Sequence, residues 1–172
     1  EFEIECDTVI IAAGLRPNVR LLEEMGVAID PATGGPVVNE YLETSIPGVF
    51  AAGNALVIND LVDYAVEQGE LAAEGAYEFL RGGIPREGWM RVSKGRNLRL
   101  AVPHYVSGER NVVIYARVQR PERRVAVQIP ELGWRLPQLG VRPAEMLRLK
   151  LSRELLAKAP GEAITLEVRP LG

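Results

Sequence analysis

The chain contains one cysteine and one histidine among its 172 residues, Cys6 and His104. A single cysteine excludes an intrachain disulfide and a CxxC redox motif. A single histidine excludes a histidine-rich metal site, so we expect no metal centre. The sequence has no run of 18 apolar residues and no signal-peptide pattern, so no membrane span is predicted. The net charge of -3 provides no basic footprint for nucleic acid. Together these absences predict a soluble cytoplasmic protein.

A further absence concerns the glycine-rich phosphate loop. No G-x-G-x-x-G motif occurs anywhere in the chain. Dinucleotide-binding domains use this motif to bring the backbone close to the pyrophosphate. We therefore expect the chain to contribute one wall of any dinucleotide site, without the loop that holds the phosphates.

Residues 44–54, with the sequence TSIPGVFAAGN, are the most informative stretch. Pro47 and Gly48 are typical of a turn, and the apolar residues 49–52 suit a short strand buried on both faces. Gly53 lets a ligand or another backbone approach closely. Asn54 follows at the carboxyl end of this strand, where open α/β sheets bind their ligands. The alternative interpretation is an ordinary buried strand that ends in a glycine turn.

A long amphipathic helix is predicted from Asp60, because apolar residues recur at helical spacing and two glycines follow at residues 82–83. Its first N–H groups point toward the same crevice and favour an anion such as a pyrophosphate. Asp63 is also a normal first-turn residue, so a structural explanation of its carboxylate stays open.

The first residues of the chain show the same alternation of strand and helix. Residues 7–14 predict a second buried strand that is closed by Gly14. Residues 19–25 then predict a short helix, and residues 27–29 pair with residues 36–38 in a hairpin. Buried strands that alternate with helices predict an α/β architecture for this half.

Two of these segments resemble motifs of the pyridine nucleotide–disulfide oxidoreductase superfamily of flavoproteins. Residues 44–54 are similar to its second flavin-contact motif, Thr-x-x-x-x-apolar-aromatic-Ala-x-Gly-Asp, with Asn54 in place of the final Asp. Residues 7–18 resemble the segment that returns from the NAD domain to the FAD domain, with Ala13 in place of the usual Thr. The resemblance implies that the chain is the C-terminal part of a larger flavoprotein.

The resemblance also implies a cofactor site. FAD would be the cofactor of the full-length parent, and NAD(P)H would be the co-substrate. Because a flavin carries the chemistry itself, no catalytic side chain is named. This chain alone is expected to be inactive, since the phosphate loops are missing. The residues implied to contact the flavin are Ala13, Gly14, Gly53, Asn54, Val62, Asp63 and Tyr64.

The composition changes at residues 82–88, a linker rich in Gly and Pro. Beyond it, several stretches alternate apolar and polar residues with period two, which predicts antiparallel strands with their own core. The predicted fold is therefore α/β plus all-β. Residues 1–84 would be the C-terminal part of a Rossmann-like FAD domain, and residues 85–172 a small antiparallel β-sandwich-like domain. Residues 98–151 resemble the C-terminal domain of NAD/FAD-dependent dehydrogenases associated with glycerol-3-phosphate dehydrogenases.

Two interpretations stay open for the aromatic residues and for the histidine of this β domain. Trp89, Tyr115 and Trp134 would either line a ligand site or serve as core and rim anchors, which is their commoner role. His104 would either transfer a proton or be structural, and without a visible partner the structural role is favoured.

The function implied by the resemblance is FAD-dependent hydride transfer between a nicotinamide cofactor and an acceptor. That acceptor would be a small molecule or an electron-carrier protein, and a homo-oligomer is compatible with the sequence. The alternative is a non-catalytic module whose β domain docks a partner subunit. Flavin absorbance of the full-length protein distinguishes the two hypotheses.

Overall fold

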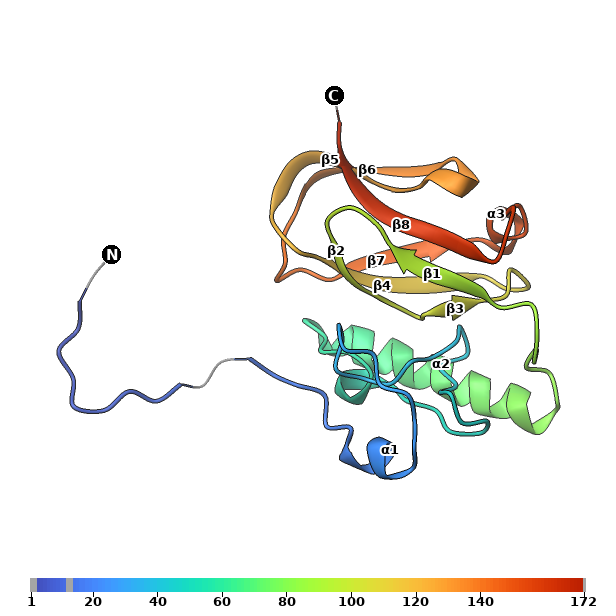
Figure 1. The fold of residues 1–172 in the computed structure, drawn as a ribbon, viewed down its shortest axis with the longest axis horizontal. Coiled ribbons are helices and arrows are strands. Elements are labelled where there is room, and N and C mark those ends of the chain that lie inside the picture. Colours follow the sequence, from blue (N-terminus) through green and yellow to red (C-terminus); the bar gives the residue numbers. More distant parts are fainter. Residues whose placement is uncertain (1–2, 12–13, 172) are drawn as a thin grey trace.

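Two β-sheets form the second half of the chain, and helix α2 lies against them together with the loops of the first half (Figure 1). The computed structural model describes residues 3–11 and 14–171. The helical segments are α1 (Arg20–Glu24), η1 (Gly53–Ala55), α2 (Val62–Leu80), η2 (Pro130–Leu132) and α3 (Arg153–Leu156). The strands are β1 (Met90–Lys94), β2 (Leu98–Val102), β3 (Tyr105–Val106), β4 (Val112–Val118), β5 (Glu122–Ile129), β6 (Trp134–Val141), β7 (Leu147–Leu151) and β8 (Ala163–Pro170).

The larger sheet has five strands in the order β3-β1-β8-β5-β6, and the smaller has three in the order β2-β4-β7. Strands β1 and β8 run parallel, with Arg91 opposite Ala163 and Lys94 opposite Leu166. The other named strand pairs of the described chain are antiparallel. The expectation of a wholly antiparallel β domain is therefore wrong at this pair. Because long connections separate β1 from β8, no hairpin turn dictates their relative direction.

The two sheets bury a continuous apolar core between them. Ile114 of β4, Val127 of β5 and Leu166 of β8 are each 0% exposed. In each of these three strands, the residues of this core occupy alternate positions. Each strand therefore turns one apolar face inward, as the period-two pattern predicts.

The outer face of the smaller sheet packs on the first half of the chain. Val38, Leu42 and Leu56 form one buried cluster with Val102 and Tyr115 of the β part. The two halves therefore share apolar packing across the linker at residues 82–88. The division into domains at residues 84 and 85 stays a prediction.

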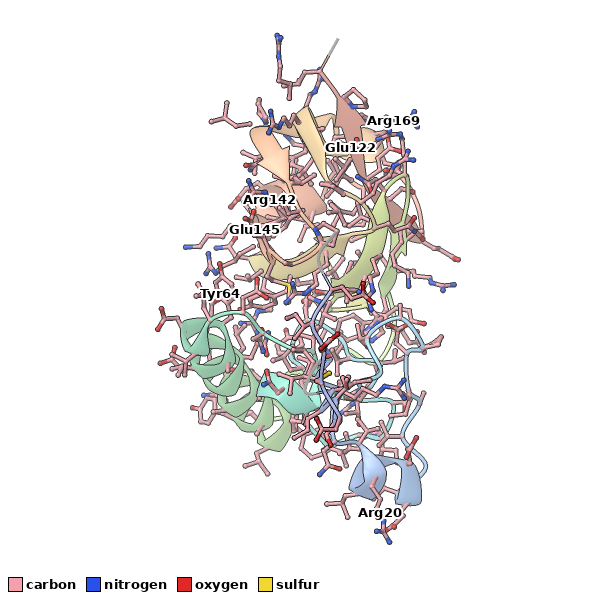
Figure 2. All side chains as sticks on the ribbon, turned by 90° about the vertical axis from the view of Figure 1, so that its left-hand side faces the viewer. Arg20, Tyr64, Glu122, Arg142, Glu145 and Arg169 are labelled. Atoms are coloured by element: carbon pink, nitrogen blue, oxygen red, sulfur yellow. The ribbon has the colours of Figure 1, made fainter. Side chains whose placement is uncertain are left out.

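Acidic residues of the α2 region meet arginines of the β part at regular intervals. Three carboxylates lie seven positions apart along the chain; two of them belong to α2 and share one side of the helix, and the first lies just before it. In the central pair, Arg148 donates to both carboxylate oxygens of Glu67, with its Nε 2.7 Å from Glu67 Oε2. The three pairs are Asp60 with Arg117, Glu67 with Arg148, and Glu74 with Arg110. Figure 2 shows Tyr64 at the end of α2 next to the β part.

The first residues of the chain depart from the sequence prediction. Residues 7–11 form no strand, and the side chains of Val9, Ile10 and Ile11 are 74%, 86% and 85% exposed. A buried strand needs hydrogen-bonded neighbours on both sides, and none of the described residues pairs with this segment. The predicted strand at residues 49–52 is also reduced. Phe50 makes one antiparallel bridge to Glu43, and only Ala51 of the four is buried.

Candidate functional site

Gly53 opens the turn that leads from residues 49–52 toward α2. Its φ of +60° lies in the left-handed region, where glycine is favoured. A Cβ added there would meet only the Cβ of Ala65, at the ordinary contact distance of 3.8 Å. The backbone conformation, rather than close packing, therefore explains the glycine, and the space beside it is open.

Asn54 takes part in a network of side-chain amides that fixes the loop ahead of α2. Its Oδ1 accepts a hydrogen bond of 3.0 Å from the backbone N–H of Asn59. Asn59 and Gln68 then exchange two reciprocal bonds of 3.1 Å, and Gln68 is 0% exposed. This network leaves the Nδ2 of Asn54, which is exposed, as the group free to donate outward. The sequence analysis did not identify Asn59 and Gln68 as members of this network. Asn59 lies just before α2 and Gln68 lies in its second turn.

The amino terminus of α2 has no side-chain cap. Leu61 precedes it in an extended conformation and offers no side-chain acceptor. Among the described residues, no acceptor is found for the N–H groups of Val62 and Asp63, whereas Tyr64 N donates to Leu61 O over 3.2 Å. The side chain of Val62 is 76% exposed. The helix, which begins eight residues after Asn54, therefore presents free N–H donors to its surroundings.

One candidate of the predicted flavin site, Gly14, lines a different part of the surface from this helix start. Gly14, with a φ of +82°, lines a separate cavity of about 800 Å³ beside α1, together with Arg16, Thr33 and Arg99. None of the other described candidates lines that cavity. Ala13 lies outside the described residues. The side chain of Tyr64 packs on Tyr115, with ring centroids 5.9 Å apart.

His104 joins the β part to the first half of the chain. Its Nδ1 accepts a hydrogen bond from Val38 N at 3.1 Å, and its own backbone N–H donates to Val38 O at 2.9 Å. Its Nε2 lies 3.4 Å from Asp30 Oδ2. These contacts assign His104 the structural role that the sequence favoured.

Asp30 lies beside two partners, His104 and Lys94. Burial raises the pKa of its carboxyl, but the contact with His104 and the charge of Lys94, 3.9 Å away, outweigh it. The net effect holds the pKa of Asp30 well below its ordinary value. The ionised form of Asp30 therefore stabilises the folded state.

We expect the Asp30 contacts to make the fold sensitive to acid. A carboxyl whose pKa is depressed by folding stabilises the fold above its unfolded pKa of about 3.9, and this contribution disappears as the pH falls below that value. Urea midpoints measured at pH 6 and pH 2.5 should therefore differ more in the wild type than in Asp30→Asn. An identical difference in the two proteins would contradict this account.

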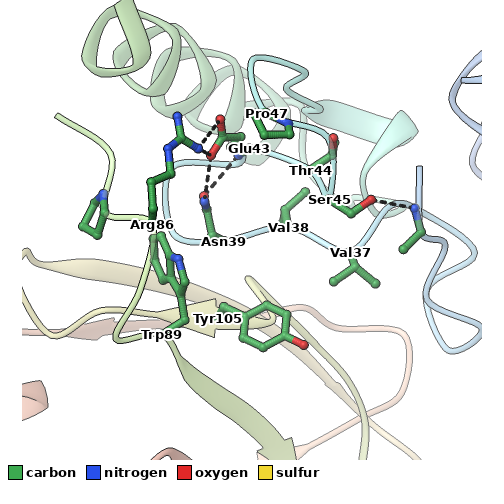
Figure 3. Close-up of a pocket in the computed structure, with 12 residues that line it drawn as sticks. Val37, Val38, Asn39, Glu43, Thr44, Ser45, Pro47, Arg86, Trp89 and Tyr105 are labelled. Atoms are coloured by element: carbon green, nitrogen blue, oxygen red, sulfur yellow. Dashed lines mark hydrogen bonds and ion pairs between the residues drawn. The ribbon is translucent and has the colours of Figure 1, made fainter. Parts of the chain in front are cut away.

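The aromatic set divides between core and surface cavity. Tyr115 is 0% exposed and its hydroxyl donates to Glu67, so it belongs to the core. Trp134 packs at the edge of the intersheet core. Trp89 instead lines a cavity between the two halves, described below (Figure 3). Within residues 3–11 and 14–171, no group of three or more potential metal ligands is found. None of the helices described combines the length and apolarity that a membrane crossing needs.

Residues 1–69 match the family model described as pyridine nucleotide-disulphide oxidoreductase. An NADH oxidase of Enterococcus faecalis is 35% identical over 112 residues, which cover 54% of this chain and 24% of that protein. The nitrite reductase [NAD(P)H] of Bacillus subtilis is 44% identical over 50 residues, 29% of this chain and 6% of that protein. The nitric oxide reductase FlRd-NAD(+) reductase of Salmonella paratyphi B is 37% identical over 83 residues, 48% and 21% respectively.

By these matches, the first part of the chain is similar to the pyridine nucleotide-disulphide oxidoreductases. The chain spans about a quarter or less of the length of these relatives. No solved structure matches the chain.

Proposed function

We propose that this chain is part of an FAD-dependent oxidoreductase that exchanges hydride with a nicotinamide cofactor. The observation that carries the proposal is the match of residues 1–69 to the superfamily model. It coincides with the stretch that ends in Gly53 and Asn54 and leads into an uncapped helix start. The names of the relatives, which refer to NADH, NAD(P)H and NAD(+), favour nicotinamide as one substrate.

In this proposal, the described residues near Gly53 and the start of α2 form one side of a flavin site. Open space beside Gly53, the outward Nδ2 of Asn54, and the free N–H groups of Val62 and Asp63 would all face the cofactor. Hydride transfer between a nicotinamide and an acceptor is the chemistry that bound FAD supplies. The protein groups supply hydrogen-bond donors and the positive end of the α2 dipole, which favour the electron-rich oxygens of a flavin. The phosphates would be held elsewhere, because no glycine-rich loop is present.

The first half of the chain exposes apolar side chains, and these support the proposal that further parts of a larger polypeptide cover them. Along α2, Val62, Val66, Tyr77 and Leu80 are between 55% and 83% exposed. The segment Val9–Ile11 is exposed as well. In the proposal, the remainder of the FAD domain covers these apolar side chains, and residues 7–14 join its sheet. Residues 98–151 resemble flavoproteins associated with glycerol-3-phosphate dehydrogenases. Because the family model ends at residue 69 and does not reach them, this resemblance is part of the proposal.

The substitution Asn54→Leu should lower the flavin content of the polypeptide that contains this chain. Leucine removes the bond to Asn59 N and every polar contact with a ligand, at about 1–3 kcal/mol for each buried group left unpaired. Asn54→Asp retains an acceptor for Asn59 N and should keep the flavin. The measurement is the ratio of absorbance at 450 nm to 280 nm after purification, followed by anaerobic reduction with NADH. A colourless wild-type protein, or full flavin content in the leucine variant, would contradict the assignment.

A further inference from the structure

A cavity of about 460 Å³ lies between the first half of the chain and the beginning of the β part (Figure 3). Residues 37–47 form one wall, and Arg86, Trp89 and Tyr105 form the other. The volume is within the range of sites that bind small molecules. None of the residues assigned above to the flavin lines this cavity, so it is a separate site.

The acceptor groups of this cavity are already used by the protein. Glu43 is 3% exposed. It accepts hydrogen bonds from Arg86 Nη1 at 3.1 Å, from Gly48 N at 2.9 Å, and from Asn39 Nδ2 at 3.3 Å. The Oδ1 of Asn39 accepts from the backbone of Tyr41 and Glu43. A ligand that needs acceptors from the wall would therefore find few of them free.

The donor groups are left available. The ion pair with Glu43 uses only Nη1 of Arg86, so two donor nitrogens of its guanidinium have no partner among the described residues. Neither the indole N–H of Trp89 nor the hydroxyl of Tyr105 donates to another described residue. Ser45 Oγ accepts from Ala28 N at 2.8 Å, which leaves its hydrogen free. Such a wall is complementary to a ligand that carries several acceptor oxygens.

The remaining lining is apolar and includes flat surfaces. Val37, Pro47 and Pro85 line the cavity together with the rings of Trp89 and Tyr105. Trp89 is oriented by an edge-to-face contact with Tyr41, with ring centroids 6.3 Å apart. Arg86 is held by buried Glu43 and lies 5.4 Å from the ring centroid of Phe79. Both groups are therefore positioned before any ligand arrives, which lowers the entropic cost of binding.

We propose that this cavity binds a small planar ring that carries carboxylate or carbonyl oxygens. Arg86 and Tyr105 donate hydrogen bonds to the oxygens, and the ring packs on Trp89. Aromatic rings stack on such surfaces with favourable offset or edge-to-face geometry. A guanidinium that keeps free N–H groups suits a carboxylate particularly well.

Tryptophan fluorescence of the full chain tests the proposal directly. The chain has two tryptophans, so Trp134→Phe leaves Trp89 as the sole reporter. Benzoate tests the planar carboxylate, benzamide the planar carbonyl, and cyclohexanecarboxylate the carboxylate without a planar ring. We expect saturable quenching by benzoate or benzamide with a Kd of about 1 mM, as suits so small a ligand. Binding of cyclohexanecarboxylate should be about tenfold weaker. Stronger binding of benzoate would identify a carboxylate, and stronger binding of benzamide a neutral carbonyl.

Matched variants connect the signal to the cavity. Arg86→Lys keeps the charge beside Glu43 but loses the planar donors, and Tyr105→Phe loses one hydroxyl. Each of these two substitutions should raise the Kd of the probe by about three- to tenfold. The control substitutions Arg135→Lys and Tyr77→Phe should leave this Kd unchanged. Circular dichroism checks that each variant is folded. If Arg86→Lys does not fold, Tyr105→Phe decides the outcome. The proposal is overturned if neither planar probe quenches Trp89 saturably, if cyclohexanecarboxylate binds equally well, or if the folded cavity variants bind like their controls.

Discussion

Replacing Gly75 by alanine should destabilise the protein by about 3 kcal/mol, although alanine is the better helix former. Gly75 is buried on the face of α2 that meets residues 41 and 50. A Cβ at this position would lie 2.1 Å from the carbonyl oxygen of Tyr41 and 3.0 Å from a ring carbon of Phe50. The first of these neighbours is backbone, so no change of side-chain rotamer relieves the overlap.

Gly69 of the same helix is the matched control. An added Cβ there has no neighbour within 4 Å, so Gly69→Ala should stabilise the protein by about 0.5–1 kcal/mol through helix propensity alone. Urea unfolding followed at 222 nm measures both variants. The double variant Gly75→Ala/Phe50→Leu relieves only the ring contact and should stay destabilised. If Gly75→Ala were as stable as Gly69→Ala, the close approach of α2 to the Tyr41 backbone would be wrong.

Removing the carboxylate of Glu67 should cost about 2–3 kcal/mol of unfolding free energy. Glu67 accepts hydrogen bonds from Arg148 and from the buried hydroxyl of Tyr115. The hydrogen bond from Arg148 lowers the pKa of Glu67 and outweighs the opposing effect of burial. Burial and the neighbouring carboxylate raise the pKa of Tyr115. In Glu67→Ala, both donors lose their partner. The buried hydroxyl of Tyr115 left unpaired is destabilising by about 1–3 kcal/mol, and Arg148, whose side chain is 25% exposed, adds a smaller loss because water can reach it.

Two further variants and the pH dependence make this second test specific. Glu67→Gln keeps an acceptor for Tyr115 and should cost only about 1 kcal/mol. Glu70→Ala changes an exposed residue of the same helix and should remain within about 0.5 kcal/mol of the wild type. Because folding depresses the pKa of Glu67, its contribution is present above the unfolded value of about 4.3 and disappears as the pH falls below it. The difference in unfolding free energy between the wild type and Glu67→Ala should therefore be smaller at pH 3 than at neutral pH. A difference that does not change with pH would contradict the ion pair.

The strands that the sequence predicted well are those with one fully apolar face. Residues 112–118 and 147–151 alternate clearly, because one side of each faces the intersheet core. Residues 98–102 also form a strand, but its register shifts between Leu98 and Leu100, so Leu98 faces the intersheet core whereas Leu100 and Val102 pack on the first half of the chain. Strand β6 was missed, because it contains Pro137 and an exposed Leu139. It lies at the edge of its sheet, where proline is tolerated since one row of N–H groups needs no partner.

The contacts between the two halves could not be predicted in the same way. The carboxylates of Asp60, Glu67 and Glu74 have a visible seven-residue spacing, but nothing local indicates their arginine partners, which lie 36 to 81 residues away. The same holds for the cavity. Trp89 was recognised as a possible ligand residue, whereas Arg86 and Tyr105 join it only through the tertiary fold.

The position of β8 in its sheet has a consequence for synthesis of the protein on the ribosome. This strand, the last one in the described chain, pairs with β1 on one side and β5 on the other. About 70 residues separate β1 from β8, which correspond to about 4–14 s of translation at ordinary rates. The edge of β1 that pairs with β8 stays unpaired for this whole interval, and the corresponding edge of β5 stays unpaired for the part of it that follows the synthesis of residue 129. Nascent chains are therefore exposed to edge-to-edge association until β8 emerges, and this is the stage at which chaperones would protect them.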